Sequence, residues 1–540
     1  MAASVEPLIT QAQAASTLTT GPALGGACAP APAAPAPVTG WRRVVADCGV
    51  VGGATTVCHV LGAATSLLLR MLLDPAQMGI WQALKLVLSY GNYANLGISK
   101  GATRDFTIAL GRGDTSRAKR GLDLAFTVNT LTSLVYAAVL VGAGAWIGLS
   151  GGGTWAGAWG AGLAVAGLLA VLSRYVTFHV TILRARQDFQ TTAQLSLLEA
   201  ALTLAACGLA TWCWGLWGLY LGTLAVLLAG LAFVWRRRAV TLAWAWDRAE
   251  IRRLVGIGGP ILLAGTVSSL FRSLDKLMIL GYLTDREYQL GCYSATLMVT
   301  VQLYGLGNML AIVMGPRYGE TYGRSGDRAE VARLAARATE LCAAAMALPA
   351  ALAIVVAPAL LARLLPDYQA GLAPLVWLVP GVAALCATLP ASQYLVAVNR
   401  QNRALAAVAT ATVLAAVGNH LALRGGYGLV GVAAATAAAY VAYWGLVVSI
   451  SLWPELDGAQ RRRYLLMIGL MLAPAVILAV ALERLHPGIE AHPVTTLAKA
   501  GAVAVVWGLT VWVGWHRGRW ADAIRRPVEV HNQTRETRTL

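Results

Sequence analysis

The stretch LLDPAQMGIW, residues 72–81, lies between two long apolar segments at about 44–69 and 80–98. Each segment approaches the roughly 20 residues that a helix needs to cross the hydrocarbon core of a bilayer. Asp74 and Pro75 interrupt the apolar run, as expected where one helix ends and the next begins. The stretch is therefore interpreted as a short connector between two membrane-spanning helices.

The same alternation of apolar segments and short connectors continues along the 540 residues, of which 57% are hydrophobic and 12% are charged. Soluble domains carry about 25% charged residues. No period-two pattern competes with helices, which satisfy their own backbone hydrogen bonds in lipid. We predict an all-α polytopic membrane protein of about 14 transmembrane helices, near 44–69, 80–98, 122–149, 157–180, 191–211, 214–235, 255–282, 290–315, 335–357, 372–398, 404–423, 429–452, 465–483 and 495–515.

The formal net charge of +17 is distributed unevenly over the connectors. If the N-terminus is cytoplasmic, 32 of the 42 Lys and Arg residues fall on the cytoplasmic side. The positive-inside rule then places both termini in the cytoplasm. Because the basic residues flank the spans instead of forming a separate domain, we expect them to orient the protein and not to bind nucleic acid.

A similar connector occurs later in the chain, LTDREYQLGCY at 283–293. Each copy is followed by an apolar segment and then by a basic loop, with GRGD at 111–114 and GRSGD at 323–327. Gly79 and Gly291 are 212 positions apart, and the first glycines of the two basic loops have the same offset. Two landmarks with one offset indicate an internal repeat of two six-helix lobes, with two further helices at the C-terminus.

The predicted organisation has five parts. They are a disordered Ala/Pro-rich cytoplasmic tail (1–40), an N-terminal six-helix lobe (41–253), a C-terminal six-helix lobe (254–453), two extra transmembrane helices (454–516) and a cytoplasmic tail (517–540).

Both connectors share an acidic residue, then a glycine, then an aromatic residue: Asp74, Gly79 and Trp81, echoed by Asp285, Gly291 and Tyr293. The apolar segment that precedes the second connector begins with LVGIGGPILL at 254–263. In the order and spacing of these motifs the chain resembles the polysaccharide biosynthesis (oligosaccharide) flippases of the multidrug/oligosaccharidyl-lipid/polysaccharide (MOP) exporter superfamily. The resemblance covers about residues 44–515.

The resemblance implies two helix bundles facing a central cavity, in the bacterial inner (plasma) membrane. It implies a transporter that flips an isoprenoid-(di)phosphate-linked oligosaccharide to the outer leaflet by alternating access, for exopolysaccharide, capsule or O-antigen synthesis. The expected partners are this lipid-linked substrate, membrane lipids, a coupling cation (Na⁺ or H⁺), and a polysaccharide polymerase and glycosyltransferases.

Ionisable residues within the predicted spans are functional candidates because they are costly at membrane depth. A lipid-linked sugar carries a phosphate, so we expect Lys85, Arg174 and Arg272 to contact the substrate as cavity cations. Glu199 and Asp275 are expected to balance these charges or to bind a coupling ion. Structural roles remain open: Arg272 and Asp275 have the spacing of a pair within one helix, and Arg174 has the length to snorkel towards the cytoplasm.

Uncharged polar residues also occur within the spans. Those predicted to contact the sugar are Asn92, Asn95, Gln302 and Asn308. Hydrogen bonds between helices are an equally good explanation of them.

Several motifs of catalysis are missing from the sequence, including the Walker A, HExxH and GxSxG patterns. The cysteines show no metal-binding spacing. We therefore expect a transporter without a cofactor or metal, and not an enzyme. Two alternatives remain: a drug or cation antiporter of the same superfamily, and a membrane-embedded glycosyl- or acyl-transferase.

Overall fold

The computed structural model describes residues 41–111, 114–150, 155–185, 188–237, 242–488 and 492–518. Every regular element in these ranges is helical. The predicted tail at 1–40 and nearly all of the tail at 517–540 lie outside the described residues.

The chain divides into two compact units. Unit 1 comprises Met1–Met298 and Thr412–Val432, and unit 2 comprises Val299–Ala411 and Ala433–Leu540. The lobe boundaries expected from the sequence stay a prediction.

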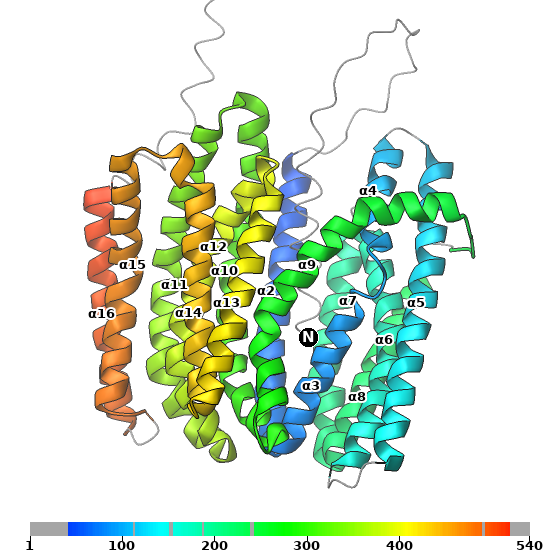
Figure 1. Cartoon of the computed structure of the whole chain (residues 1–540), viewed down its shortest axis with the longest axis horizontal. Helices are drawn as coiled ribbons and strands as arrows, with labels where there is room; N and C mark the ends of the chain where they lie inside the picture. Colours follow the sequence, from blue (N-terminus) through cyan, green and yellow to red (C-terminus); the bar gives the residue numbers. More distant parts are fainter. Residues whose placement is uncertain are drawn as a thin grey trace, which may run out of the picture. The chain divides into compact units, whose positions relative to one another are not determined.

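Unit 1 contains most of the N-terminal helices (Figure 1). They are α2 (Trp41–Leu72), α3 (Pro75–Gly91), α4 (Ile98–Gly111), α5 (Thr115–Ser150), α6 (Ala156–Ala185), α7 (Phe189–Leu202), the π-helix η2 (Thr203–Cys207), α8 (Gly208–Arg237), α9 (Arg248–Tyr282), the first part of α10 (Arg286–Ser325), and the facing ends of α13 (Gln401–Arg424) and α14 (Gly428–Ser451).

Unit 2 contains the rest of α10, α13 and α14 together with the C-terminal helices. These are α11 (Arg328–Leu364), the short 3₁₀ helix η3 (Pro366–Gly371), α12 (Ala373–Ala397), the 3₁₀ helix η4 (Trp453–Glu455), α15 (Gly458–Leu485) and α16 (Pro493–Gly518).

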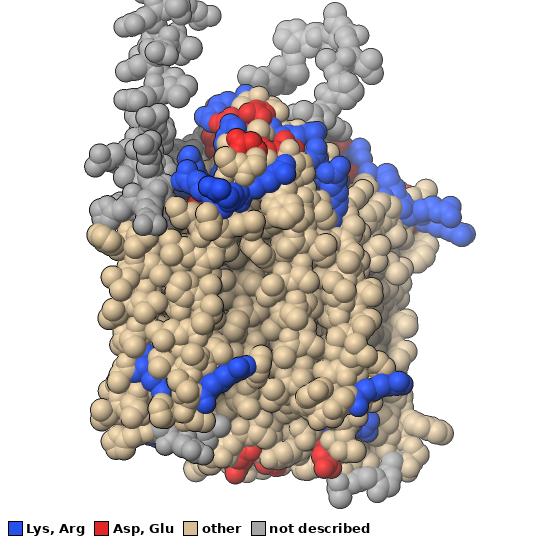
Figure 2. Space-filling view, turned by 60° about the vertical axis from the view of Figure 1, so that its left-hand side comes forward, with Lys and Arg blue, Asp and Glu red and all other residues tan. Residues whose placement is uncertain are grey.

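Twelve helical segments in the described ranges are long and apolar enough to cross a membrane. One of them, Phe189–Arg237, has 49 residues and is interrupted at Gly215, whose φ of 57° and ψ of −134° are not helical. It is long enough for two crossings, as predicted from the sequence. Figure 2 shows long stretches of uncharged surface, with Lys, Arg, Asp and Glu gathered towards the helix ends. The predicted all-α fold of roughly 14 membrane helices is confirmed.

The second predicted span, near 80–98, is α-helical only as far as Gly91, and another helix begins where the span was expected to end. α3 ends at Gly91 and α4 begins at Ile98, and between them Leu96 and Gly97 have positive φ angles of 52° and 81°. Gly97 also touches α9, because a Cβ on it would lie 2.6 Å from the carbonyl carbon of Gly258. α4 therefore does not continue the direction of α3, and it packs along the first turns of α9 (Figure 1).

The two repeated glycines touch each other's connectors. A Cβ on Gly79, in α3, would lie 1.7 Å from the carbonyl oxygen of Glu287, in α10. A Cβ on Gly291 would lie 1.6 Å from the carbonyl oxygen of Pro75. The starts of α3 and α10 thus cross backbone to backbone, and each copy of the repeat requires a glycine because the other copy lies against it.

In unit 2, the core is built largely from alanines, including Ala335, Ala343, Ala387 and Ala391, which are at most 1% exposed. Such small side chains let membrane helices approach closely. Lys499 pairs with Glu483 between α16 and α15, since Nζ lies 3.4 Å from Oε2 with both side chains at most 7% exposed. The backbone N–H of Gly488 donates to the same carboxylate, which closes the turn between α15 and α16.

We expect Gly79→Ala and Gly291→Ala to destabilise the protein by several kcal/mol, because the added methyl group overlaps backbone that has no room to move. Thermal unfolding of the purified protein measures the effect. Gly142→Ala in α5 is the matched control, because a Cβ there meets nothing within 4 Å. Wild-type stability in either repeat variant would show that the close crossing is not needed.

Candidate functional site

Three basic side chains lie near one another within unit 1: Arg70 in α2, Lys85 in α3 and Lys276 in α9. Arg70 and Lys276 are close enough for their charges to repel the Lys85 ammonium group. Two of the three helices that carry this positive charge, α2 and α9, are long and apolar enough to span the membrane. The positive charge is suited to a ligand with negative charge.

Lys85, a predicted cavity cation, contacts the aromatic residue of the first connector. Its Nζ lies 5.6 Å from the centre of the Trp81 ring, a cation–π contact. Trp81 is itself 6% exposed and packs against Tyr220, with ring centres 6.1 Å apart. The aromatic residue of the connector motif thus supports a partly buried lysine, and the ammonium group has donors left for a ligand.

Arg70 is not among the site residues expected from the sequence. Its side chain is 4% exposed. Nε donates to Ser294 Oγ at 3.1 Å, and Nη1 donates to the carbonyl oxygen of Ser66 at 2.6 Å. Arg70 therefore ties α2 to α10 within unit 1.

Asp275 and Arg272 both lie in α9, as predicted. Asp275 is 2% exposed and accepts a hydrogen bond of 3.0 Å from the hydroxyl of Tyr293. Arg272 is half-buried. Next to it, Ser273 is hydrogen-bonded to the Tyr90 hydroxyl of α3 at 2.6 Å. The contact of Ser273 with Tyr90 joins α9 to α3, the helix that carries Lys85.

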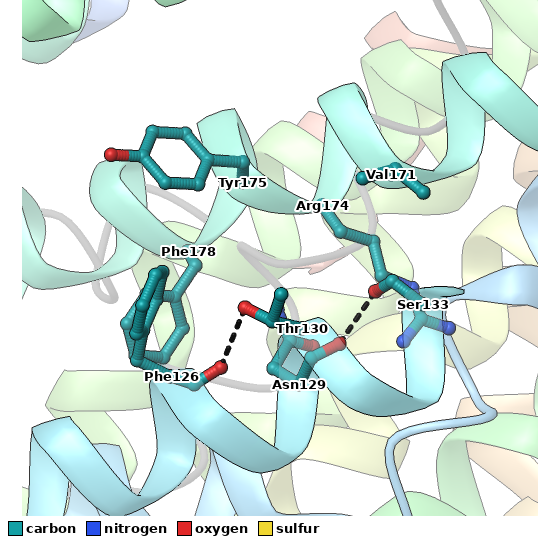
Figure 3. Close-up of a pocket in the computed structure, with 8 residues that line it drawn as sticks. All are labelled: Phe126, Asn129, Thr130, Ser133, Val171, Arg174, Tyr175 and Phe178. Atoms are coloured by element: carbon teal, nitrogen blue, oxygen red, sulfur yellow. Dashed lines mark hydrogen bonds between the residues drawn. The ribbon is translucent and has the colours of Figure 1, made fainter. Parts of the chain in front are cut away.

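Arg174 occupies a different place in unit 1. It lies in α6 and is 4% exposed, and none of its three guanidinium nitrogens has a hydrogen-bond partner. Together with α5 residues, including Asn129 and Ser133, it lines a small cavity of which Lys85 is not a part (Figure 3). The structure thus does not bring Arg174 and Lys85 together in one pocket, and a substrate contact of Arg174 stays a prediction.

Glu199 lies in α7, directly before the π-helix η2. Its Oε1 approaches α8 closely, since a Cβ on Gly230 would lie 3.0 Å from it. The hydrogen bonds and ion pairs of the described residues include none to this half-buried carboxylate. A π-helix often marks a functional site in a membrane or soluble helix, and the unpaired acid beside it fits a site for a proton or cation.

The polar candidates have different surroundings. Asn95 serves the local backbone, because its Oδ1 accepts the Gly97 N–H at 3.0 Å, and Asn92 caps the end of α3. Gln302 and Asn308 lie in α10 within unit 2. Asn308 is 2% exposed and its Oδ1 has no hydrogen-bond partner among the described residues.

No group of three or more His, Cys, Asp or Glu residues in the described ranges could hold a metal ion.

A charge network at the ends of α4, α5 and α9 was not foreseen from the sequence. Arg253 makes two hydrogen bonds to the Asp105 carboxylate, at 3.1 and 2.8 Å, and Arg117 makes a third at 3.3 Å. Burial acts to raise the pKa of Asp105, but the hydrogen bonds from Arg253 and Arg117 hold that pKa below its usual value of 3.8. Some of the basic loop residues thus join helices in addition to orienting them.

Comparison with solved structures identifies the fold. The chain matches the lipid II flippase MurJ in an inward closed conformation, with a TM-score of 0.65 and 11% identity over 88% of this chain and 99% of that one. It matches an inward-facing multidrug resistance MATE family transporter of the MOP superfamily with a TM-score of 0.58 and 15% identity, over 76% and 95% of the two chains. A MOP superfamily transporter from Pyrococcus furiosus gives 0.53 and 14%, over 78% and 96%. The fold is that of the MOP transporters.

Residues 70–367 match the profile of the family described as polysaccharide biosynthesis protein. The chain belongs to this family, as its connector motifs indicated. No curated protein sequence matches it. The predicted fold of the MOP superfamily and the predicted membership of a polysaccharide biosynthesis family are confirmed.

Asp105→Asn should lower the free energy of unfolding at pH 7 by about 1–3 kcal/mol, because Arg253 and Arg117 lose a charged acceptor. The loss is limited because both arginines are partly exposed. The pKa of Asp105 is lower in the folded state than in the unfolded chain. The stabilisation by this carboxylate is therefore fully present at a pH above its pKa in the unfolded chain, and it is lost as the pH falls through its pKa in the folded protein. Thermal unfolding should therefore show a larger difference between the variant and the wild type at pH 7 than at pH 3. A difference of equal size at both pH values would contradict this account.

Proposed function

We propose that this polysaccharide biosynthesis protein flips an isoprenoid-(di)phosphate-linked oligosaccharide across the bacterial inner membrane by alternating access. The family match over residues 70–367 supports a role in polysaccharide synthesis. The observation that carries the choice of an anionic lipid-linked substrate is the excess positive charge around Lys85 in unit 1.

The chemistry of the substrate explains why cations are needed. A phosphate or diphosphate group is very costly in hydrocarbon unless fixed positive charges replace its hydration. Lys85 supplies a compact ammonium group, and Arg272 supplies a guanidinium with the geometry for phosphate oxygens. Arg70 keeps the neighbouring helices in place and adds its charge. This group of positive charges would repel the cationic substrate of a drug antiporter.

Sugar recognition is assigned to uncharged polar residues. In unit 2, Asn308 holds a buried oxygen without a partner, which suits a hydroxyl donor. Gln302 lies in the same helix, six residues earlier. Asn92 remains a candidate in unit 1, whereas Asn95 already uses its side chain to shape the break between α3 and α4.

Coupling to an ion gradient is assigned to Glu199, with Asp275 as the charge that balances the α9 cations. The Glu199 carboxylate is half-buried beside Gly230 of α8 and precedes the π-helix. A carboxylate in such a place changes its charge when a proton or Na⁺ binds, and that change alters its fit against the neighbouring helices.

Lys85→Gln and Arg272→Gln are expected to reduce export of surface polysaccharide by about thirtyfold or more, the effect of losing about 2 kcal/mol of a charged contact. Lipid-linked precursor should accumulate in the cytoplasmic leaflet, as measured by extraction and by labelling of surface sugars. Lys119→Gln, on the exposed surface of α5, is the matched control. Normal polysaccharide export with reduced dye efflux would instead favour the antiporter.

Glu199→Gln is expected to leave substrate binding near wild type while making transport into proteoliposomes insensitive to the imposed proton or sodium gradient. The amide keeps the size of the side chain and removes its titration. Glu320→Gln removes an exposed carboxylate from α10 and serves as the control. Gradient-driven transport at the wild-type rate in Glu199→Gln would exclude this residue from coupling.

A further inference from the structure

Helix α9 is longer than a membrane crossing requires. It runs from Arg248 to Tyr282 and contains Pro260. The part from Pro260 onwards is by itself long enough to cross the hydrocarbon, which takes about 20 residues. A proline inside a helix removes one backbone hydrogen bond and allows a bend. In Figure 1 the beginning of α9 crosses the direction of α5 and α6, whereas the rest of the helix bends to follow them. The residues before Pro260 therefore have the orientation of a helix that lies along the membrane surface.

The connector that leads into α9, residues 242–247, has no regular secondary structure and is fixed to α5. The backbone N–H of Ala243 donates to Asp123 Oδ1 at 3.0 Å. The backbone N–H of Ala245 donates to Thr127 Oγ1, also at 3.0 Å. Two side chains from successive turns of α5 thus hold the connector, and with it the beginning of α9, in a defined place.

Two tryptophans of this connector face outward. Trp244 is 64% exposed and Trp246 is 68% exposed. The Trp244 ring keeps an edge-to-face contact with Phe126 of α5, with ring centres 5.9 Å apart. Exposed tryptophans are typical of the headgroup level of a bilayer, because the ring is apolar and its N–H is polar. They place the connector at the same level as the beginning of α9.

Two exposed arginines follow in the first turns of α9. Arg248 and Arg252 are four residues apart and therefore lie on one face of the helix. The ion pairs of the described residues include none for either side chain. A different face is packed, since Leu254 is 0% exposed and a Cβ on Gly101 of α4 would lie 2.1 Å from its carbonyl oxygen. The beginning of α9 thus rests on α4 and presents a basic face outward.

The acidic residues of the same turn do not neutralise this face. Asp247 pairs with Arg120 of α5, with 2.7 Å between Oδ2 and Nη2. Glu250 pairs with Arg253, with 2.5 Å between Oε1 and Nη2. The helix dipole also disfavours a positive charge at the first position, so Arg248 does not stabilise the helix that carries it. The surplus positive charge suits an anionic partner.

The membrane surface supplies a partner of matching chemistry. A phospholipid phosphate accepts hydrogen bonds from a guanidinium, and a leaflet with net negative charge attracts basic side chains next to it. Figure 2 shows Lys and Arg gathered along the upper border of the uncharged surface, the level at which headgroups are expected. Tryptophans beside arginines match both parts of this region, the apolar and the charged.

We propose that residues 242–259, which we call the interfacial arm, bind anionic phospholipid headgroups in the leaflet on the side of the basic loops. Arg248 and Arg252 contact the lipid phosphates, and Trp244 and Trp246 lie between the headgroups. Because the arm leads directly into α9, the bound lipid holds the entry of that helix against the membrane surface. The site is separate from the Lys85 group and does not depend on which substrate the protein moves.

The test titrates the purified full chain in detergent with a short-chain phosphatidylglycerol and, in parallel, with the phosphatidylcholine of the same chain length. Phosphatidylglycerol should raise the melting temperature at lower concentration, because a ligand that binds the folded state stabilises it. High salt should reduce the difference between the two lipids. The double variant Arg248→Gln/Arg252→Gln should need about thirtyfold more phosphatidylglycerol, as expected for the loss of two basic residues at an anionic surface. Arg248→Lys/Arg252→Lys should keep most of the preference.

The matched control is Arg333→Gln/Arg337→Gln, which removes two exposed arginines of the same spacing from α11, where no tryptophan precedes them. It should keep the wild-type preference. Trp246→Gln should weaken the response to both lipids and leave the preference between them unchanged.

A local measurement accompanies the melting curves. In nanodiscs, hydrogen exchange of the interfacial arm should be slower with equal parts of phosphatidylcholine and phosphatidylglycerol than with phosphatidylcholine alone, and Arg248→Gln/Arg252→Gln should remove the difference. Equal responses to the two lipids, an unchanged preference in that double variant, or equal stabilisation by inorganic phosphate would each overturn the proposal. Arginines that only orient the chain would give the second of these results. Failure of the flippase proposal would leave all of these outcomes unaffected.

Discussion

A group in the hydrocarbon of a bilayer has no water to bond with, so its partners must come from the protein or from a ligand. The helices satisfy this requirement for most of the backbone. The buried side chains satisfy it through specific contacts, of which Arg70 with Ser66 and Ser294 and Lys499 with Glu483 are the clearest. These charges stabilise the packing of their units because each one has a partner.

Against that background, the charges without full protein partners stand apart. Lys85 contacts the Trp81 ring. Among the described residues, Glu199 has no ion-pair partner and the three guanidinium nitrogens of Arg174 have no hydrogen-bond partner. Charged groups without a partner within membrane helices are candidates for binding a ligand. Their surroundings differ: two further cations act on Lys85, whereas Glu199 precedes a π-helix.

Some features could be predicted because they depend on local sequence. Apolar segments of sufficient length predicted the membrane helices, and the break at Gly215 lies at the start of the predicted span 214–235. The repeat of Gly79 and Gly291 was visible as a spacing of 212 positions, but only the structure showed that each glycine makes room for the other connector. The contact of Arg70 with Ser294 could not be predicted, because Ser294 lies 224 positions away in the chain.

The sequence by itself determined that the chain is a helical membrane protein with an internal repeat and a few charges within its spans. Hydropathy and periodicity follow from consecutive residues, so they need no knowledge of the fold. Only the tertiary structure decided which of those charges have partners. It buried Arg70 between helices, broke the second span so that α4 packs on α9, and placed Arg174 apart from Lys85. The reason is that pairing, burial and cavity formation depend on distances between residues that are remote in the chain.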